Sequence, residues 1–219
     1  MHGNKEKLYC QNLCLLGKLF LDHKTLYHEV ETFQFFVLTE DNHFYNTNTI
    51  VGYFSREMTL CEDFNLACIM VLPPYQRKGY GRFLIAFSYY LSGQIDDLCC
   101  TPERPLSELG ALSYKSYWKH TIFEALKSNE AFKKGNTDIT VREISDYTKI
   151  QIDDIVLTLE SMNLVKYWRG SYLLKNISQR LIENTLKQTT NTDRVVFNAQ
   201  FILPSKIEML KSKDILKRR

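Results

Sequence analysis

A short apolar run followed by a glycine-containing turn constrains the fold more than any other stretch of this chain. Residues 67–72 are consecutively apolar and end at two prolines, Pro73 and Pro74. The run is too short for a helix of ordinary length, so it predicts a strand buried on both faces that stops at Pro73. Apolar residues at helical spacing resume at Tyr80. The stretch therefore predicts a strand, a glycine-containing turn and a helix in succession.

The turn has the composition of an anion-binding site. Gly79 and Gly81 lack the Cβ atoms that would keep a pyrophosphate away from the backbone, and the first N–H groups of a helix attract anions. Further donors come from Gln76, Arg77, Lys78 and Arg82. A Gly-x-Gly turn alone is most often an ordinary turn without a ligand. The stretch has no Gly-Lys-Ser/Thr ending, and Leu84 occupies the position of the third glycine of a dinucleotide fingerprint, which excludes both of those motifs.

Composition narrows the class of protein further. The chain has 219 residues, of which 44% are hydrophobic and 24% charged, which is typical of a folded domain with a small appendage. The net charge of +3 does not indicate a nucleic-acid-binding protein. Residues 204–219 hold six basic and two acidic residues, and we interpret them as a solvated basic tail. The start has no signal-peptide pattern, so we expect a soluble intracellular protein.

The six cysteines are scattered through a large domain, so we expect reduced thiols. Cys10 and Cys14 stand four residues apart without a second pair at zinc-finger spacing. Their spacing favours one face of a helix over metal ligands. We therefore predict no metal site.

Hydrophobic periodicity outlines the remaining elements. We expect helices over 8–21 and 107–127, a hairpin of strands 33–39 and 50–55, and a strand over 65–72 that joins the hairpin. This gives an α/β fold of the α+β type, with helices packed on a mixed sheet. Within the second helix the expected core residues are Leu109, Leu112, Tyr117 and Trp118.

A second unit follows a polar, glycine-containing stretch. Residues 140–143 form a capping-box pattern that opens a short helix, and a second helix and a hairpin follow. This order is typical of a winged helix, which invites a DNA-binding interpretation. The helix that would read DNA carries three acidic residues, Asp153, Asp154 and Glu160, which weaken binding to phosphates. We therefore expect this unit to pack on the core without direct DNA binding, and divide the chain into residues 1–133, 134–200 and 201–219.

Five long sequence words resemble the MYST family of lysine acetyltransferases. In family order they are residues 8–16, 18–27, 51–55, 65–85 and 101–110. The resemblance covers the chain to about residue 176. It implies an acetyltransferase fold, acetyl-CoA as co-substrate and a lysine of a histone tail as acceptor. It further implies a nuclear protein that regulates transcription together with the subunits of a chromatin-modifying complex, and no membrane.

The resemblance also assigns roles to single residues. Glu103 matches the family's general base and Cys68 its active-site cysteine, which either carries the acetyl group transiently or lines the site during direct transfer; we favour direct transfer. Without the resemblance, Glu103 would be one acid among many and Cys68 an inert buried thiol. Lys24 matches a lysine that these enzymes acetylate on themselves.

Contacts with the coenzyme follow from the same resemblance. The backbone of Ile69, Met70 and Val71 matches the segment beside the pantetheine. The pyrophosphate loop is matched by Gln76, Arg77, Lys78, Gly79, Tyr80, Gly81 and Arg82. Ser107 and Ser116 match further coenzyme contacts, and Ser107 also suits the N-cap of the following helix.

Two departures from the family favour a second interpretation. The family places a zinc finger and further strands ahead of Leu8, and this chain starts seven residues earlier, so we expect exposed strand edge or apolar surface there. Residues 92–101 are one residue longer than the family pattern and lack its usual lysine and glycine. Both departures favour a catalytically impaired, acetyl-CoA-binding scaffold subunit of a chromatin complex. The retained Cys68, Glu103 and Gly-x-Gly turn favour an active enzyme.

Overall fold

The computed structural model of this chain describes most of the sequence. The described residues are 1–19, 29–42, 47–58, 63–95, 97–128, 139–190 and 195–215. Lys24 and the end of the expected first helix, Phe20 and Leu21, lie outside them. Across the described ranges, no helix combines the length and the apolar character needed to span a bilayer.

A three-stranded antiparallel sheet organises the N-terminal half. β1 (Phe33–Asn42) and β2 (Thr47–Glu57) form the expected hairpin, and β4 (Cys68–Val71) pairs with the other edge of β2. Phe36 and Phe54 are opposite each other, and their rings stack with centroids 4.7 Å apart. Such aromatic pairs fix the register of a hairpin. The predicted hairpin is confirmed, with longer strands than expected.

The apolar run 67–72 does not form a single strand with the residues before it, so that prediction is wrong in part. β3 (Phe64–Leu66) pairs in parallel with β5 (Thr101–Pro102), whereas β4 pairs with β2. Ala67 lies between the two short strands, and its N–H donates to the carbonyl of Ser55 at 2.8 Å. The chain changes its pairing partner at Ala67, because the residues before it form backbone hydrogen bonds with β5 and the residues after it with β2.

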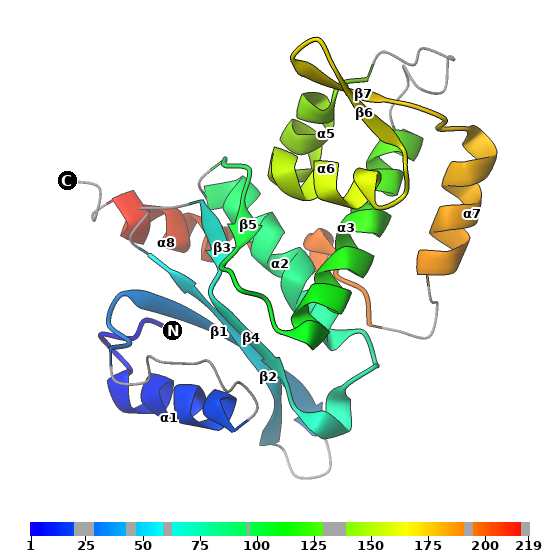
Figure 1. The fold of residues 1–219 in the computed structure, drawn as a ribbon. Helices are drawn as coiled ribbons and strands as arrows, with labels where there is room; N and C mark the ends of the chain where they lie inside the picture. Colours follow the sequence, from blue (N-terminus) through cyan, green and yellow to red (C-terminus); the bar gives the residue numbers. More distant parts are fainter. Residues whose placement is uncertain are drawn as a thin grey trace.

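The sheet that contains β4 has helices on both of its faces (Figure 1), and the side chains of β4 alternate between them. Met70 packs on the inner side of α1 (Lys7–Lys18), whereas Ile69 and Val71 pack towards α2 (Tyr80–Ile95). Of these three only Met70 is buried, because β4 is the edge strand of the described sheet. Both faces of this strand are covered, as predicted, but its side chains are not all buried, so that part of the prediction is wrong.

The inner face of α1 carries both cysteines of the first helix. Cys10 and Cys14 are buried one turn apart on this face, as their spacing predicts, and neither is in a disulfide. On the outer side Leu8 and Leu15 are exposed. The helix ends at Lys18, with Leu19 as its C-cap.

The other half is helical and surrounds α3 (Glu108–Ser128). Its further elements are α5 (Val141–Thr148), α6 (Ile152–Glu160), β6 (Val165–Trp168), β7 (Ser171–Leu174) and α7 (Gln179–Thr189). Side chains from α2, α3, α5, α6 and α7 form one continuous apolar cluster. The capping box of Thr140 and Glu143 is present with both of its hydrogen bonds. The winged-helix comparison and the division into three parts remain predictions.

Two of the four residues expected in the core of α3 are not there. Tyr117 and Trp118 are buried as predicted, whereas Leu109 and Leu112 are 61% and 66% exposed. The buried side chains of α3 begin at Tyr114, so the first turn and a half of the helix contributes no buried side chain. Apolar character alone therefore misplaced these two leucines.

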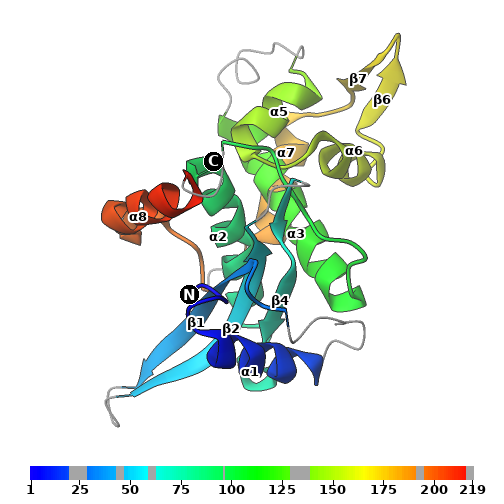
Figure 2. The ribbon, with the colours of Figure 1, turned by 90° about the vertical axis from the view of Figure 1, so that its left-hand side faces the viewer.

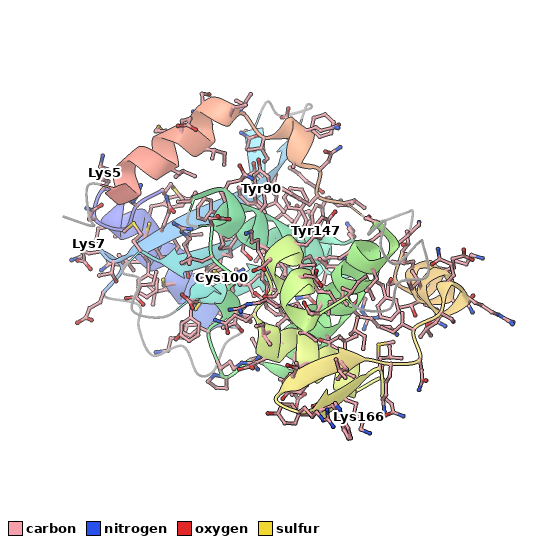
Figure 3. The ribbon with its side chains drawn as sticks, turned by 90° about the horizontal axis from the view of Figure 1, so that it is seen from above. Lys5, Lys7, Tyr90, Cys100, Tyr147 and Lys166 are labelled. Atoms are coloured by element: carbon pink, nitrogen blue, oxygen red, sulfur yellow. The ribbon has the colours of Figure 1, made fainter. Side chains whose placement is uncertain are left out.

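Residues 92–101 are not a loop throughout. Ser92 belongs to α2, which continues to Ile95, and its hydroxyl donates to the carbonyl of Ser88 at 3.1 Å. Cys100, labelled near the centre of Figure 3, then forms an isolated parallel bridge with Ile150 at the turn between α5 and α6. This segment joins the sheet to the helical half.

The C-terminal segment packs along α2. Phe197 contacts the rings of Phe83 and Phe87, with centroids 5.6 and 5.8 Å apart. A short helical turn, η2 (Ala199–Phe201), leads into α8 (Pro204–Ile215), which lies beside α2 (Figure 2). Ile207 is buried there, so residues that looked like a basic tail include a packed helix.

Candidate functional site

The glycine turn begins directly after β4. A short helical turn, η1 (Pro73–Tyr75), ends the strand, and the side-chain amide of Gln76 donates back to the carbonyl of Val71 at 3.1 Å. Arg77 and Gly79 have φ values of 63° and 97°, and α2 starts at the next residue. Gly79 suits this left-handed conformation because it has no Cβ. The predicted sequence of strand, turn and helix is confirmed.

The first turn of α2 presents backbone N–H groups without carbonyl partners inside the helix. The first internal bond runs from the Phe83 N–H to the carbonyl of Gly79 at 2.9 Å, so the N–H groups of Tyr80 and Gly81 precede the helical ladder. A Cβ added at Gly81 would meet only Val71 Cγ2, at 3.9 Å. The packing of the chain itself does not require a glycine at this position. The residues present therefore fit a close-lying anionic group such as a pyrophosphate.

The cations of the turn point to different places. Arg77 and Lys78 are exposed, and Lys78 Nζ lies 5.4 Å from the centroid of the Tyr75 ring. The guanidinium of Arg82 donates to the carbonyl of Thr189 at 2.8 Å, at the C-terminal end of α7. A cation there is stabilised by the helix dipole. Arg77 and Lys78 therefore supply side-chain charge at the turn, while Arg82 ties α2 to α7.

Tyr80 anchors the start of α2 to the sheet. Its hydroxyl donates to the carboxylate of Glu40 on β1, and its ring meets the edge of Tyr75 with centroids 6.2 Å apart. These contacts hold the first turn of α2 against both β1 and η1.

His120 makes the junction of α3 and α7 sensitive to acid. Its Nδ1 lies 2.9 Å from the hydroxyl of Thr189, and burial, helped by the cation of Arg82, lowers the pKa of His120 to about 4. The folded state thus binds a proton less readily than the unfolded chain, whose histidine titrates near 6.5. The contribution of neutral His120 to the free energy of unfolding is therefore complete above pH 6.5 and is lost as the pH falls towards 4.

His120→Gln is expected to flatten the decline of the free energy of unfolding between pH 6.5 and pH 4, because the substituted side chain takes up no proton. Urea unfolding at several pH values measures this.

Glu103 directly follows β5, and Cys68 opens β4 two residues after the end of β3, the partner of β5. Glu103 follows β5, is exposed, and its N–H donates to the carbonyl of Leu66 at 2.9 Å. Leu66 precedes Cys68 by two residues, and Cys68 is half-buried at the start of β4. Pairing of β3 with β5 therefore brings the segments of the two residues together, despite the altered length of 92–101.

Two serines lie along α3. Ser107 caps the helix, because its hydroxyl accepts the N–H of Gly110 at 3.1 Å, so the N-cap role is confirmed. Ser116 is exposed two turns further along. Their contacts with a coenzyme remain predictions.

Asp154 is a residue whose place the sequence did not reveal. It lies on α6 and is one of the three acids expected to weaken DNA binding, yet its side chain is 2% exposed and its carboxylate accepts bonds from Thr101 and Arg104. Burial raises the pKa of Asp154, and both of these partners oppose the rise. The nearest sequence signal was an acidic residue directly before the apolar pair Ile155 and Val156.

Comparisons with known proteins show what this chain is similar to. The chain matches the model of the MOZ/SAS family over residues 1–202. It is 49% identical over 195 residues to the histone acetyltransferase Tip60 homolog of Caenorhabditis elegans, covering 85% of this chain and 41% of that protein. It is 45% identical over 207 residues to the histone acetyltransferase MOF of Drosophila melanogaster, covering 91% and 24%. It is 51% identical over 172 residues to the histone acetyltransferase of the MYST family 1 of Arabidopsis thaliana, covering 78% and 37%. The chain thus spans less than half the length of each of these relatives.

Proposed function

The chain belongs to the MOZ/SAS family, whose relatives include named MYST histone acetyltransferases, and from this we propose that it transfers an acetyl group from acetyl-CoA to a lysine side chain of a histone. The observation that carries the proposal is the register of β3 and β5. It joins the Glu103 segment to the Cys68 segment at one end of the strand that leads into the glycine turn.

Binding of the coenzyme would rest on the first turn of α2. The N–H groups of Tyr80 and Gly81 can donate to the diphosphate, and Arg77 and Lys78 add positive charge beside it. Gly81 leaves room for the close approach. The backbone of residues 69–71 would lie along the pantetheine, and Ser107 and Ser116 would contact the coenzyme from α3. Supporting this, β4 runs directly into the turn.

The acceptor needs a base. A lysine side chain has a pKa of about 10.4 and is almost fully charged at neutral pH, so a proton must leave before attack. Glu103 would accept that proton, and the neutral amine would attack the carbonyl carbon of the thioester. The C–N bond forms, the C–S bond breaks, and the coenzyme thiolate takes up the proton that the nitrogen loses. Glu103 then returns its proton to solvent.

Direct transfer makes a specific prediction for Cys68. Because the thiol would line the site without carrying the acetyl group, Cys68→Ala should retain turnover within about tenfold, the scale of a change in positioning. The rate is measured at saturating acetyl-CoA and peptide, and circular dichroism checks that the variant is folded. Near-complete loss of turnover in a folded Cys68→Ala protein would instead indicate an acetyl-cysteine intermediate.

Further parts of the proposal follow from the family. A nuclear location, membership of a chromatin-modifying complex and self-acetylation at Lys24 belong to it, and Lys24 lies outside the described residues. The unit of α5, α6 and the β6–β7 hairpin would serve as a winged-helix-like support for the catalytic core. Its packing against α2 and α3 supports that role over DNA binding.

The proposed activity is tested by incubating the chain with labelled acetyl-CoA and histone peptides. Transfer of label to the peptide, at a rate that rises with the concentration of the chain, would support the proposed enzyme activity. Tight coenzyme binding without label on the peptide would support the scaffold alternative.

A further inference from the structure

A buried carboxylate in the helical half contacts the segment of the proposed base. Asp154 is buried and lies on α6, and Glu103 is the residue that directly follows β5. Burying a carboxylate is unfavourable unless partners compensate for its lost hydration. The hydrogen-bond partners of Asp154 therefore indicate the role of its buried carboxylate.

Both carboxylate oxygens of Asp154 are engaged. Oδ2 accepts the hydroxyl of Thr101 at 2.7 Å, and Oδ1 accepts an N–H of the Arg104 guanidinium at 2.5 Å. The Thr101 side chain is buried, while the Arg104 side chain is 49% exposed. One buried acid thus holds two residues that are three positions apart, and Glu103 lies between them.

The same short segment is fixed from the other side by the sheet. The Thr101 N–H donates to the carbonyl of Asp63 at 3.0 Å, and the Glu103 N–H donates to the carbonyl of Leu66. Cys100 is held by the α5–α6 turn, through the carbonyl of Lys149 and the N–H of Gln151. The Glu103 backbone is therefore clamped between β3 and α6, and Asp154 makes the side-chain contacts on the α6 side.

We propose that Asp154 is a positioning residue that fixes Glu103, through Thr101 and Arg104, at the place where a substrate lysine is deprotonated. The proposal rests on Glu103 being the base. In this proposal the helical unit takes part in the reaction, because α6 orients Glu103 without contacting the substrate. It also explains why Arg104 extends towards α6 and not along the exposed side of the segment.

The test compares variants of the full chain that remove one contact each. Asp154→Asn removes the charge at similar size, Arg104→Gln removes the cation and Thr101→Val removes the hydroxyl. Each is expected to lower kcat for a lysine peptide by roughly tenfold to a hundredfold at neutral pH, the scale of a small misplacement of a catalytic group. The Kd for acetyl-CoA, measured by calorimetry, should not change. Arg104→Lys keeps a cation and should recover most of the rate.

A readout specific to the base separates positioning from general destabilisation. Near pH 9.5 more of the substrate lysine is neutral, because its pKa is about 10.4, so the base matters less and the loss of rate should shrink. Added to Glu103→Gln, Asp154→Asn should cause no further loss. An equal loss of rate at both pH values, or a weaker Kd for acetyl-CoA in parallel, would overturn the proposal. If Asp154→Asn does not fold, the kinetics of Arg104→Gln decide whether the proposal holds, because the Arg104 side chain is half-exposed.

A neighbouring acid is the matched control. Asp153 precedes Asp154 on α6 and is exposed, so Asp153→Asn should keep the wild-type rate. If Glu103→Gln itself leaves the rate unchanged, the base assignment fails and the positioning role fails with it. If Glu103→Gln lowers the rate while the Asp154 and Arg104 variants match wild type, only the positioning role fails.

Discussion

Glu103→Gln is expected to lower kcat for a lysine peptide by about a hundredfold to ten-thousandfold, the usual contribution of a general base. The amide is similar in shape to the carboxylate but cannot accept a proton at neutral pH. Glu103 is exposed beyond β5, so the fold and the affinity for acetyl-CoA should be preserved. Steady-state kinetics with peptide, together with calorimetry for acetyl-CoA, measure the two effects separately.

Glu108 offers the control for this variant. It is an exposed acid at the start of α3, five residues further along the chain, and Glu108→Gln should keep wild-type kinetics. A Glu103→Gln enzyme with wild-type kcat would show that the carboxylate takes no part in deprotonation.

Gly81→Ala is expected to change stability and coenzyme affinity in opposite directions. Alanine favours a helix over glycine by up to about 1 kcal/mol, and the new Cβ would meet only Val71 Cγ2 at 3.9 Å, so the free energy of unfolding should rise. The same methyl group would stand beside the N–H groups proposed to bind the diphosphate. Weakening charge-assisted hydrogen bonds of about 1.5–3 kcal/mol should raise the Kd for acetyl-CoA about tenfold to a hundredfold.

Gly93 lies in the same helix, four turns from its start, and serves as the control. Gly93→Ala would bring a Cβ to 3.2 Å from Lys149 Cγ, so the Lys149 side chain would have to shift slightly, but the site is close to the other end of α2 and the Kd for acetyl-CoA should not change. Urea unfolding and calorimetry measure both variants. A Gly81→Ala protein with wild-type affinity would exclude the first turn of α2 as the diphosphate site.

Local patterns predicted the parts of the fold that local interactions determine. The aromatic runs of β1 and β2, the helical spacing from Tyr80 and the capping box at Thr140 each identified their element before any long-range contact was known. The same holds for Cys10 and Cys14, whose spacing alone places them on one face of α1.

The errors have a common cause in long-range pairing. The strand expected over 65–72 divides at Ala67 because β3 pairs with β5, which is distant in the sequence. Leu109 and Leu112 are exposed because the helical cluster starts only at Tyr114. No periodicity within a short window carries information about such partners.

The site was predictable to different degrees. The glycine turn follows from its composition, whereas Cys68 and Glu103 stood out only through the family resemblance, because a thiol in a strand and an acid after a proline are ordinary features. Arg82 contacts a residue of α7 that is 107 positions away in the sequence. Asp154 contacts residues of the Glu103 segment that are about 50 positions away. Their roles follow from the tertiary structure.

The most direct test is transfer of labelled acetyl from acetyl-CoA to a histone peptide by this chain alone, with coenzyme binding measured on the same sample. If the diphosphate is held at the start of α2 and Glu103 takes the proton from the amine, the coenzyme binds and label accumulates on peptide lysine. A chain that binds acetyl-CoA tightly and leaves the peptide unlabelled at every pH would contradict this account.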